Sequence, residues 1–440
     1  MAEPLRVGLA GLGTVGSAVA GMLMRERGAI AERAGRAIEV VAYASKDPPK
    51  DNTLDLTKLR KIDSPVALAR DGAIDVFVEL MGGEGEPAKG SVEAALGMGR
   101  PVVTANKALL ARHGVALARL AESKNAELCF EAAVAGGIPI VKTLREGLGG
   151  SRIARVYGIL NGTCNYILTR MYKERLSFAD CLKEAQRLGY AEADPTFDIG
   201  GFDTAHKLAI LTSLAFGTEV DADAVHVEGI ESISLVDLEA ADELGYRVKL
   251  LGVAQRTEAG IEQRVHPTMV PKGNVIAEID GVINAVAIDS DTMELTLMGP
   301  GAGGAATSSA VVADLMDLAA GRRVASFGRP AVGLVKAPRA PMQRHEGGYY
   351  IRLAAVDRPG TAATIAGRMA DQNISLESIM QRGRDRRPHG GDDPRSANKP
   401  APVALITYAT TEDAVRLALA AIETDGVLAE KPQVIRIEKS

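Results

Sequence analysis

The feature that most constrains the fold of this chain is a glycine-rich turn near its N-terminus. Leu5–Ala10 is an apolar segment typical of a buried strand, and Gly11-Leu-Gly-Thr-Val-Gly16 follows it directly. Ser17–Met24 then shows the apolar spacing of a helix. A strand, a glycine turn and a helix in this order predict a site for the phosphates of a dinucleotide.

Each glycine of this turn has its own expected task. Gly11 permits the tight turn, Gly13 lets the backbone approach a pyrophosphate, and Gly16 lets the helix pack closely on the strand. The helix N-terminus, with the N–H groups around Thr14 and Val15, offers a partial positive charge to the phosphates. We therefore expect these five residues to bind the cofactor.

The second expected strand ends at residues that bear on cofactor choice. Ala37–Ala44 is followed by Ser45, Lys46 and Asp47. A basic residue at this strand tip accommodates the 2′-phosphate of NADP, whereas an acidic one binds the ribose 2′-hydroxyl of NAD. Ser45 and Lys46 favour NADP, with NAD possible because Asp47 is adjacent. Lys46 as an ordinary surface lysine is the alternative.

The next segments continue an alternation of strands and helices. The expected strands are Ile74–Leu80, Pro101–Thr104 and Ala126–Glu131, and the expected helices lie around Ser91–Met98 and Ala108–Ser123. Such alternation predicts an α/β domain with a doubly wound parallel sheet over residues 1–140. Ligands bind beyond the carboxyl ends of such strands.

Two strand ends carry candidate binding residues. Thr104-Ala-Asn-Lys107 follows a strand, which gives Lys107 a route into the cofactor crevice. Glu131-Ala-Ala-Val-Ala-Gly-Gly-Ile-Pro139 combines a carboxylate with a glycine loop whose carbonyl oxygens suit a hard cation. An interdomain turn is an equal alternative for this loop.

A dense group of charges follows in the central block, residues 141–299, which we expect to be an α+β catalytic and dimerisation domain. Five ionisable residues surround the Gly200-Gly201 turn, namely Glu192, Asp194, Asp198, Asp203 and Lys207. We expect Asp203 to be the N-cap of the helix that follows and to hold Lys207 as an oriented ammonium. A surface ion pair is the alternative. Asp194 is expected to be a turn residue before Pro195, and His206 is given no role.

Composition limits the remaining classes of function. The chain has 440 residues, a formal charge of −5 and only 4% aromatic residues. It shows no basic field for nucleic acid, no long apolar run for a membrane and no signal-peptide pattern. Cys129, Cys164 and Cys181 are unevenly spaced, which suggests neither disulfides nor a zinc site. We expect a cytoplasmic enzyme that acts on a small molecule.

The last ninety residues predict a separate module. After a linker at 336–348, the segment 349–440 has a β-α-β-β-α-β order with strands at Tyr349–Val356, Asn373–Met380, Pro402–Ala409 and Gln433–Glu438. This order resembles the ACT domain, an amino-acid-binding regulatory module. The resemblance implies an effector at the loop after the first strand, made of Asp357, Arg358, Pro359 and Gly360. A module that only dimerises is the alternative, and the stretch 382–400 is expected to be a mobile hairpin loop.

The motifs together resemble those of the homoserine dehydrogenases over residues 1 to about 335. They are Gly11–Gly16, Thr104–Lys107, Asn161-Gly162-Thr163, Ala185–Lys207 and Met298–Gly304. The resemblance implies NAD(P)H-dependent reduction of L-aspartate 4-semialdehyde to L-homoserine in threonine and methionine biosynthesis. Because the first strand begins at Leu5, no aspartokinase domain is expected before it.

The resemblance also implies roles for single residues. Lys207 is the implied proton donor, Asp203 supports it, and Lys107 contacts both cofactor and substrate. Glu192 and Asp198 bind the amino end of the substrate, with Asn161, Gly162, Thr163 and Tyr190 as further substrate contacts. Thr104 and Gly303 join the cofactor site, and the return of the chain at Gly303 implies that a helix over Ser308–Ala320 completes the cofactor domain within about 300–335. A sodium ion is implied at Glu131, Val134, Gly136 and Ile138.

Regulation and assembly are also expectations. The ACT-like order implies feedback inhibition by L-threonine, and the resemblance implies a homodimer or homotetramer. Two alternatives remain, another dehydrogenase for an amino-acid aldehyde and an inactive amino-acid sensor that keeps the cofactor fold. The presence of Lys107, Asp203 and Lys207 argues against an inactive site.

Overall fold

The computed structural model describes residues 3–51, 53–356, 358–381 and 400–438. Within them, the first sheet has six parallel strands in the order β3-β2-β1-β4-β5-β6. The strands are β1 (Leu5–Ala10), β2 (Ile38–Ala44), β3 (Arg60–Lys61), β4 (Val76–Glu79), β5 (Val102–Thr104) and β6 (Leu128–Cys129). This arrangement confirms the doubly wound sheet. The chain reverses between β1 and β4, where such sheets bind ligands.

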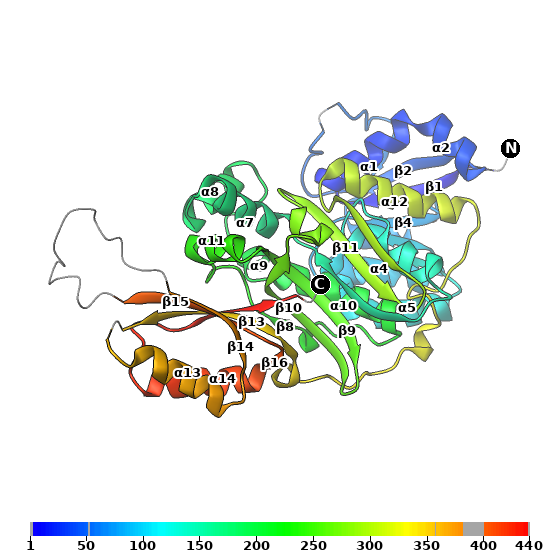
Figure 1. Cartoon of the computed structure of the whole chain (residues 1–440). Coiled ribbons are helices and arrows are strands. Elements are labelled where there is room, and N and C mark those ends of the chain that lie inside the picture. Colours follow the sequence, from blue (N-terminus) through cyan, green and yellow to red (C-terminus); the bar gives the residue numbers. More distant parts are fainter. Residues whose placement is uncertain (1–2, 52, 357, 382–399, 439–440) are drawn as a thin grey trace.

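Helices connect these strands. They are α1 (Thr14–Arg25), α2 (Arg27–Ala34), α3 (Pro65–Arg70), α4 (Ala88–Gly97) and α5 (Lys107–Ser123). The helix expected over Ser308–Ala320 is α12 (Gly304–Ala319), and it lies beside α1 (Figure 1). Val311 and Leu315 of α12 share one buried core with Val7 and Val19, so a late segment completes the N-terminal layer.

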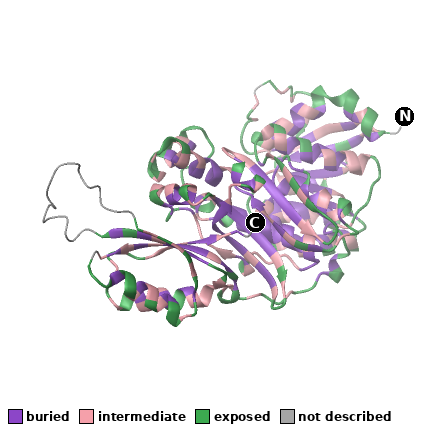
Figure 2. Ribbon diagram, in the orientation of Figure 1, coloured by how far each residue is buried: buried purple, intermediate pink, exposed green. Residues whose placement is uncertain are grey.

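A second, mostly antiparallel sheet runs through the central and C-terminal parts of the molecule. Within the described residues it has eleven strands, with the main order β12-β11-β7-β9-β10-β17-β13-β15-β14. The central strands are β7 (Ile153–Ile159), β8 (His226–Val227), β9 (Tyr246–Thr257), β10 (Gly260–Pro271), β11 (Ile283–Ser290) and β12 (Glu294–Pro300). The purple strands in Figure 2 show that this sheet is largely buried.

Helices surround this central part. They are η1 (Glu131–Ala133), α6 (Ile140–Lys142), η2 (Thr143–Gly147), α7 (Gly162–Glu174), α8 (Phe178–Arg187), α9 (Thr196–Ile199), α10 (Phe202–Phe216), η3 (Ala222–Ala224), α11 (Leu235–Glu243) and η4 (Val275–Glu278). Ser177 starts α8 by accepting a hydrogen bond from the Asp180 N–H, and Ser234 forms a capping box with Asp237 at α11. The apolar run of α10 packs against β7, β9 and β10, which fixes its first turn beneath the sheet.

The C-terminal part has the expected β-α-β-β-α-β order. It contains β13 (Glu346–Ala355), α13 (Thr361–Asp371), β14 (Leu376–Gln381), β15 (Ala401–Thr407), a short β16 (Thr410–Thr411), α14 (Glu412–Thr424) and β17 (Gln433–Ile437). Figure 1 shows α13 and α14 on one face of this sheet. We call these residues, 346–438, the C-terminal module. Its β17 pairs in parallel with β10, a continuity with the central sheet that the sequence did not reveal.

The segment before the C-terminal module is tied to the central part. After η5 (Ala331–Gly333), Val335 accepts a hydrogen bond from the Glu219 N–H, and Arg339 pairs with Asp221. Then η6 (Met342–Arg344) leads into β13. No helix among the described residues is both long and apolar enough to cross a membrane.

Candidate active site

Three helix N-termini meet at the candidate active site. Lys107 is the first residue of α5, Asn161 is the N-cap of α7, and Asp203 lies in the first turn of α10. Direct contacts of the Asp203 carboxylate with Lys107 and Asn161 bring these ends together. The partial positive charge of helix N-termini favours anionic groups at such a point. The site therefore suits a reaction in which an oxygen gains negative charge.

Asp203 is the buried centre of this site, with only 4% of its surface exposed. Its Oδ2 lies 2.7 Å from the Lys207 Nζ and accepts a hydrogen bond of 2.8 Å from the Asn161 amide. Its Oδ1 lies 3.0 Å from the Lys107 Nζ. Burial opposes ionisation, but the charges of Lys207 and Lys107 outweigh it and hold the pKa of Asp203 well below its usual range. Asp203 is thus an anion shared by two ammonium groups.

The prediction that Asp203 is the N-cap of its helix was wrong. The N-cap is Gly201, in a left-handed conformation with φ of +87°, and α10 begins at Phe202. A side chain at this position would lie only 3.0 Å from Val265 and 3.1 Å from Val227. Glycine therefore makes the sharp turn into α10, and the Asp203 carboxylate is free to bind other side chains.

Lys207 is oriented by two acceptors. It lies one turn after Asp203 on α10 and is 8% exposed. Its Nζ donates to Asp203 Oδ2 at 2.7 Å and to the Leu160 carbonyl at 2.7 Å. An ammonium has three donors, so one N–H has no acceptor within the described part of the chain. The alternative of a routine surface pair is excluded by this burial.

Lys107 binds the other oxygen of the same carboxylate but is more accessible, with 34% of its side chain exposed. The Asp203 charge raises the pKa of Lys107, with burial opposing and Asp198 and Glu192 adding to the rise. Lys107 therefore remains an ammonium at neutral pH. Its more open position suits contact with two bound molecules, as expected for a residue shared by cofactor and substrate.

Asn161 joins two carboxylates, which the sequence did not indicate. Its amide donates to Asp198 Oδ1 at 2.9 Å and to Asp203 Oδ2 at 2.8 Å, while its Oδ1 accepts from the Cys164 N–H. Asn161 is the N-cap of α7, and Gly162 and Thr163 form the first turn of that helix. With both amide hydrogens in use, the Asn161 side chain orients acids of the protein.

The remaining substrate candidates surround this core. Asp198 is partly buried, and burial together with the charge of Asp203 raises its pKa, with Asn161 opposing. Glu192 and Tyr190 are exposed, and the Thr163 hydroxyl donates to the Tyr190 carbonyl. Asp194 is an exposed turn residue, as predicted, that accepts a hydrogen bond from the Thr196 N–H. Asp198 is therefore the candidate that is linked to Asp203, through the Asn161 amide.

The glycine turn has the shape of a phosphate cradle. Gly11 has φ of +95°, and a Cβ there would lie 2.7 Å from the Leu80 carbonyl oxygen. A Cβ on Gly16 would lie 2.0 Å from the Gly11 carbonyl oxygen, whereas one on Gly13 would meet nothing within 4 Å. The outer glycines therefore permit close packing, and Gly13 leaves open space where the pyrophosphate of a dinucleotide fits.

The other residues predicted to bind the cofactor differ in how close they lie to the glycine turn. Gly303, with φ of +101°, is the N-cap of α12, and a Cβ on Gly304 would lie 3.2 Å from the Thr14 carbonyl oxygen, so the starts of α12 and α1 adjoin. Lys46 is exposed just beyond β2. Ser45 instead supports the glycine turn, since its hydroxyl accepts from the Leu12 N–H and donates to the Asp47 carbonyl.

Glu79 is a residue that the sequence reasoning missed. It lies at the carboxyl end of β4, is fully buried, and accepts hydrogen bonds from Thr104 Oγ1 (2.6 Å), the Met81 N–H (2.8 Å) and the Gly82 N–H (3.2 Å). Thr104 in turn accepts from the Asn106 N–H, directly before Lys107. An acidic residue ending an otherwise apolar strand was the available signal.

We expect Glu79→Ala to loosen both loops that Glu79 joins. The buried Thr104 hydroxyl and the partly buried Met81 and Gly82 N–H groups would lose their acceptor, at a cost of about 1–3 kcal/mol for a buried group left unsatisfied and less for N–H groups that water reaches. Urea unfolding should show a loss of roughly 3 kcal/mol in stability, and the KM for the cofactor should rise. Glu79→Gln keeps an oxygen for the two N–H groups and should lose less. An unchanged cofactor KM in Glu79→Ala would contradict this role.

The Glu131 loop has the features of a cation site. Glu131 is buried beside Asp314, and its carboxylate accepts from the Val141 and Lys142 N–H groups. Burial and the Asp314 charge raise the pKa of Glu131 to about 7. The carbonyl oxygens of Val134 and Gly136 accept no hydrogen bond within the described residues, although both residues are buried.

The predicted effector loop is only partly described, because Asp357 lies outside the described residues. Arg358 and Gly360 line a cavity of about 150 Å³ with Thr361, Ile365 and Gln381. Gly360, with φ of +95°, is the N-cap of α13. Residues 358–360 thus lead into a helix start beside a small cavity.

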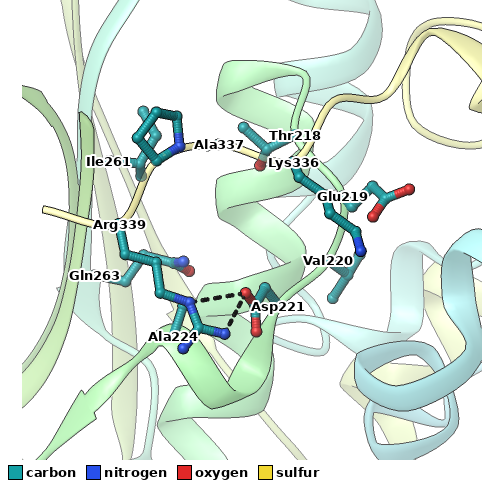
Figure 3. A pocket seen from close by; sticks show the side chains of 11 residues that line it. Thr218, Glu219, Val220, Asp221, Ala224, Ile261, Gln263, Lys336, Ala337 and Arg339 are labelled. Carbon is teal, nitrogen blue, oxygen red and sulfur yellow. Dashed lines mark hydrogen bonds and ion pairs between the residues drawn. The ribbon is translucent and has the colours of Figure 1, made fainter.

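A larger cavity of about 410 Å³ lies away from the Asp203 cluster (Figure 3). It is lined by the loop after α10, the start of β10 and the 336–339 segment. The Arg339–Asp221 pair crosses it. None of its lining residues belongs to the predicted catalytic or cofactor set.

Comparison with known proteins gives the family. Residues 139–316 match the family model "Homoserine dehydrogenase", and residues 11–131 match "Homoserine dehydrogenase, NAD binding domain". The homoserine dehydrogenase of Neisseria gonorrhoeae is 42% identical, with 99% of each chain covered. The chain belongs to the homoserine dehydrogenase family. It is an NAD(P)-dependent oxidoreductase acting on a CH–OH group, as the sequence resemblance implied.

Solved homoserine dehydrogenases share this fold. The crystal structure of the enzyme from Thiobacillus denitrificans has a TM-score of 0.91 and 43% identity, and 99% of each chain is covered. A hyperthermophilic archaeal homoserine dehydrogenase mutant, solved in complex with NADPH, has a TM-score of 0.61 and 27% identity, and covers 71% of this chain and 97% of its own. The family models and the named relatives thus show homoserine dehydrogenase activity with a nicotinamide cofactor.

Proposed function

We propose that Lys207 donates the proton when aspartate semialdehyde is reduced to homoserine. The observation that carries this proposal is its buried ammonium, fixed by Asp203 and the Leu160 carbonyl, with one donor left for a ligand. A positioned acid close to an oxygen that gains charge both stabilises it and supplies its proton. The reduced nicotinamide, when bound, supplies the hydride.

The protonation states of the site support this direction of transfer. Asp203 stays ionised because its pKa is well below the usual range, so an anion lies against the side-chain nitrogens of both lysines before the reaction. As the aldehyde oxygen becomes an alkoxide, the Lys207 ammonium faces a far stronger base than Asp203. Lys207 therefore gives its proton to that oxygen, and the nearby Lys107 ammonium limits the loss of positive charge.

Substrate binding is proposed to use the acids around Asp203. Asp198 lies near the buried Asp203, and burial together with the Asp203 charge raises the pKa of Asp198. The substrate ammonium would pair with the Asp198 carboxylate, with Glu192 as a second, exposed partner. Three further residues are proposed to border the substrate ammonium site. Gly162 and Thr163 follow Asn161 in the first turn of α7, and Tyr190 is held there by the hydrogen bond from the Thr163 hydroxyl to its carbonyl.

We propose NADP as the preferred cofactor. The NADPH complex of the archaeal homoserine dehydrogenase supports this choice, as does exposed Lys46 at the tip of β2. We expect Lys46→Ala to raise the KM for NADPH about threefold to tenfold, since one charge-assisted contact is lost at an exposed site, and to leave the KM for NADH unchanged. Initial rates with each cofactor measure this. Equal changes for both cofactors would contradict a 2′-phosphate contact.

We also propose a sodium ion at the Glu131 loop. The donor set fits a hard monovalent cation, because the buried residues Val134 and Gly136, in the same loop as Glu131, have carbonyl oxygens that accept no hydrogen bond from the described residues. The Ile138 carbonyl, which accepts from the Ile140 N–H, would complete the set. Replacing sodium by choline at constant ionic strength should lower the thermal midpoint of the wild type. An equal shift in Glu131→Gln would count against the site.

We propose that the C-terminal module is an ACT-type regulatory module that binds L-threonine. Its β-α-β-β-α-β order and the cavity beside Arg358 and Gly360 support this. We expect threonine to inhibit the wild type, and Arg358→Ala to require about tenfold more threonine, as befits the loss of one charged contact. A threonine titration with each protein checks this. Rates independent of threonine would leave the alternative, a module that only dimerises.

Assembly and domain division are proposed on the same basis. We propose that residues 1–140 together with 300–335 bind the cofactor. Residues 141–299 would bind the substrate and residues 349–440 the effector, with 336–348 as the linker before this last region. We propose a homodimer or homotetramer formed by the central sheet. Light scattering of the purified chain measures the oligomer directly.

A further inference from the structure

The C-terminal module continues the sheet of the central part of the molecule. Thr268 and Met269 of β10 pair with Arg436 and Ile437 of β17, and the Glu438 N–H donates to the Met269 carbonyl at 2.8 Å. This pairing places the Arg436 side chain inside the junction, where it is only 4% exposed. A guanidinium buried in this way needs carboxylate partners to compensate for its lost hydration.

Arg436 has partners on both sides. Its guanidinium donates to both oxygens of Glu228, at 2.8 and 2.9 Å, and to both oxygens of Glu412 in α14, at 3.0 and 2.8 Å. Bidentate arginine–carboxylate pairs fix orientation as well as distance. Arg436 therefore sets the place of Glu228 relative to the C-terminal module.

Glu228 belongs to a short segment, 226–230, that contacts the substrate side of the active site. The Ile230 N–H donates to the Ile199 carbonyl at 2.9 Å. A Cβ on Gly229 would lie 2.4 Å from the Ile199 carbonyl oxygen and 2.8 Å from the Gly200 Cα, so the two backbones are in close contact. Asp198 is the residue directly before Ile199. A shift of segment 226–230 therefore moves the backbone that carries Asp198.

We propose that Glu228 is a positioning residue that acts on the substrate site. Arg436 of the C-terminal module fixes Glu228, and the segment that carries Glu228 holds Asp198 in place. This inference rests on the proposed role of Asp198 in binding the substrate ammonium. The Arg436–Glu228 pair couples the C-terminal module to the substrate site and not to the cofactor site. This is because segment 226–230, which carries Glu228, contacts residues 199–201 and not the glycine turn. Asp198 itself is held from the other side by Asn161.

A second ion pair of the same junction provides a matched control. Arg155 of β7 pairs with Glu438, two residues after Arg436, with an NH2–Oε1 distance of 2.5 Å, and both side chains are largely buried. Within the described residues, the Arg155 guanidinium interacts with Asp289, Glu438 and the Tyr157 ring, none of which belongs to segment 226–230. Arg155→Met thus removes one arginine from the junction without releasing Glu228.

The test compares steady-state constants and unfolding midpoints of Glu228→Gln, Arg436→Met and Arg155→Met in the full chain. We expect the first two to raise the KM for aspartate semialdehyde about fivefold to tenfold, with the KM for NADPH unchanged. Arg436→Lys keeps the charge but not the bidentate geometry. Its KM for aspartate semialdehyde should therefore lie between that of the wild type and those of Glu228→Gln and Arg436→Met. Arg155→Met should lower the midpoint and leave both KM values unchanged.

Further variants separate this inference from the role of Asp198. If Asp198→Asn raises the KM for aspartate semialdehyde, the double variant Asp198→Asn/Glu228→Gln should show no further rise, because Glu228 acts through Asp198. An unchanged KM in Glu228→Gln beside a raised KM in Asp198→Asn would overturn the inference alone. An unchanged KM in Asp198→Asn would overturn the substrate role of Asp198. If the KM for aspartate semialdehyde rises in proportion to the loss of stability in Glu228→Gln, Arg436→Met and Arg155→Met alike, the Arg436–Glu228 pair has only a structural role.

Discussion

Replacing Asp203 by asparagine is expected to lower kcat about a hundredfold or more and to destabilise the folded enzyme by roughly 3 kcal/mol. The change leaves the nearly buried Lys207 ammonium and the Lys107 ammonium without their shared anion. Breaking a buried pair by removing one partner leaves an uncompensated charge. Lys207 would also lose one of the two acceptors that orient it.

The pH dependence of this stability follows from the direction of the pKa shift. The pKa of Asp203 is lower in the folded chain than the value of about 3.9 for an unfolded aspartate. Its contribution is therefore complete above that value and is lost as the pH falls toward the folded pKa. Urea unfolding of both proteins at pH 7 and near pH 3 should show a smaller difference at the lower pH. Asp194→Asn, an exposed acid of the same segment, is the control and should match the wild type.

Replacing Lys207 by methionine is expected to reduce kcat by about 10³-fold, within the range for loss of a general acid. Methionine keeps most of the side-chain length but can neither stabilise the alkoxide nor protonate it. Asp203 would retain Lys107 and Asn161 as partners, so the cofactor domain should keep its affinity for NADPH. Rates at saturating substrate, with NADPH affinity from fluorescence titration, measure both quantities.

A second buried lysine provides the control for Lys207. Lys249 of β9 is 3% exposed and donates to the Ile279 carbonyl and to Asn165. Lys249→Met removes a comparable buried ammonium away from the Asp203 cluster. We expect it to lower the unfolding midpoint while kcat stays within about threefold of the wild type. A similar loss of kcat in both variants would show that the effect of Lys207→Met comes from damage to the fold.

Local patterns in the sequence were sufficient to predict much of this enzyme. The glycine turn, the alternation up to residue 131 and the run after Lys207 each encode an element through neighbouring residues. The pairing of Asp203 with Lys207 was also predictable, because residues four apart lie on one face of a helix. Such short-range relations do not depend on the rest of the chain.

Contacts between distant segments were not predictable in this way. Asn161 joins Asp198 and Asp203, and Glu79 joins two loops, because the fold brings separate helix and strand ends together. The parallel pairing of β17 with β10 likewise depends on register between strands far apart in the sequence. The wrong N-cap at Asp203 has a local cause, since Gly201 alone fits the crowded left-handed turn.

The most direct test of the proton donor is a paired comparison of Lys207→Met and Lys107→Met, with kcat and both KM values measured for aspartate semialdehyde and NADPH. If Lys207 gives the proton, its variant should lose about 10³-fold in kcat with both KM values nearly unchanged. Lys107→Met should instead raise both KM values and lose less in kcat. A Lys207→Met enzyme that keeps its kcat while Lys107→Met loses it would assign the proton to Lys107 and contradict the proposed mechanism.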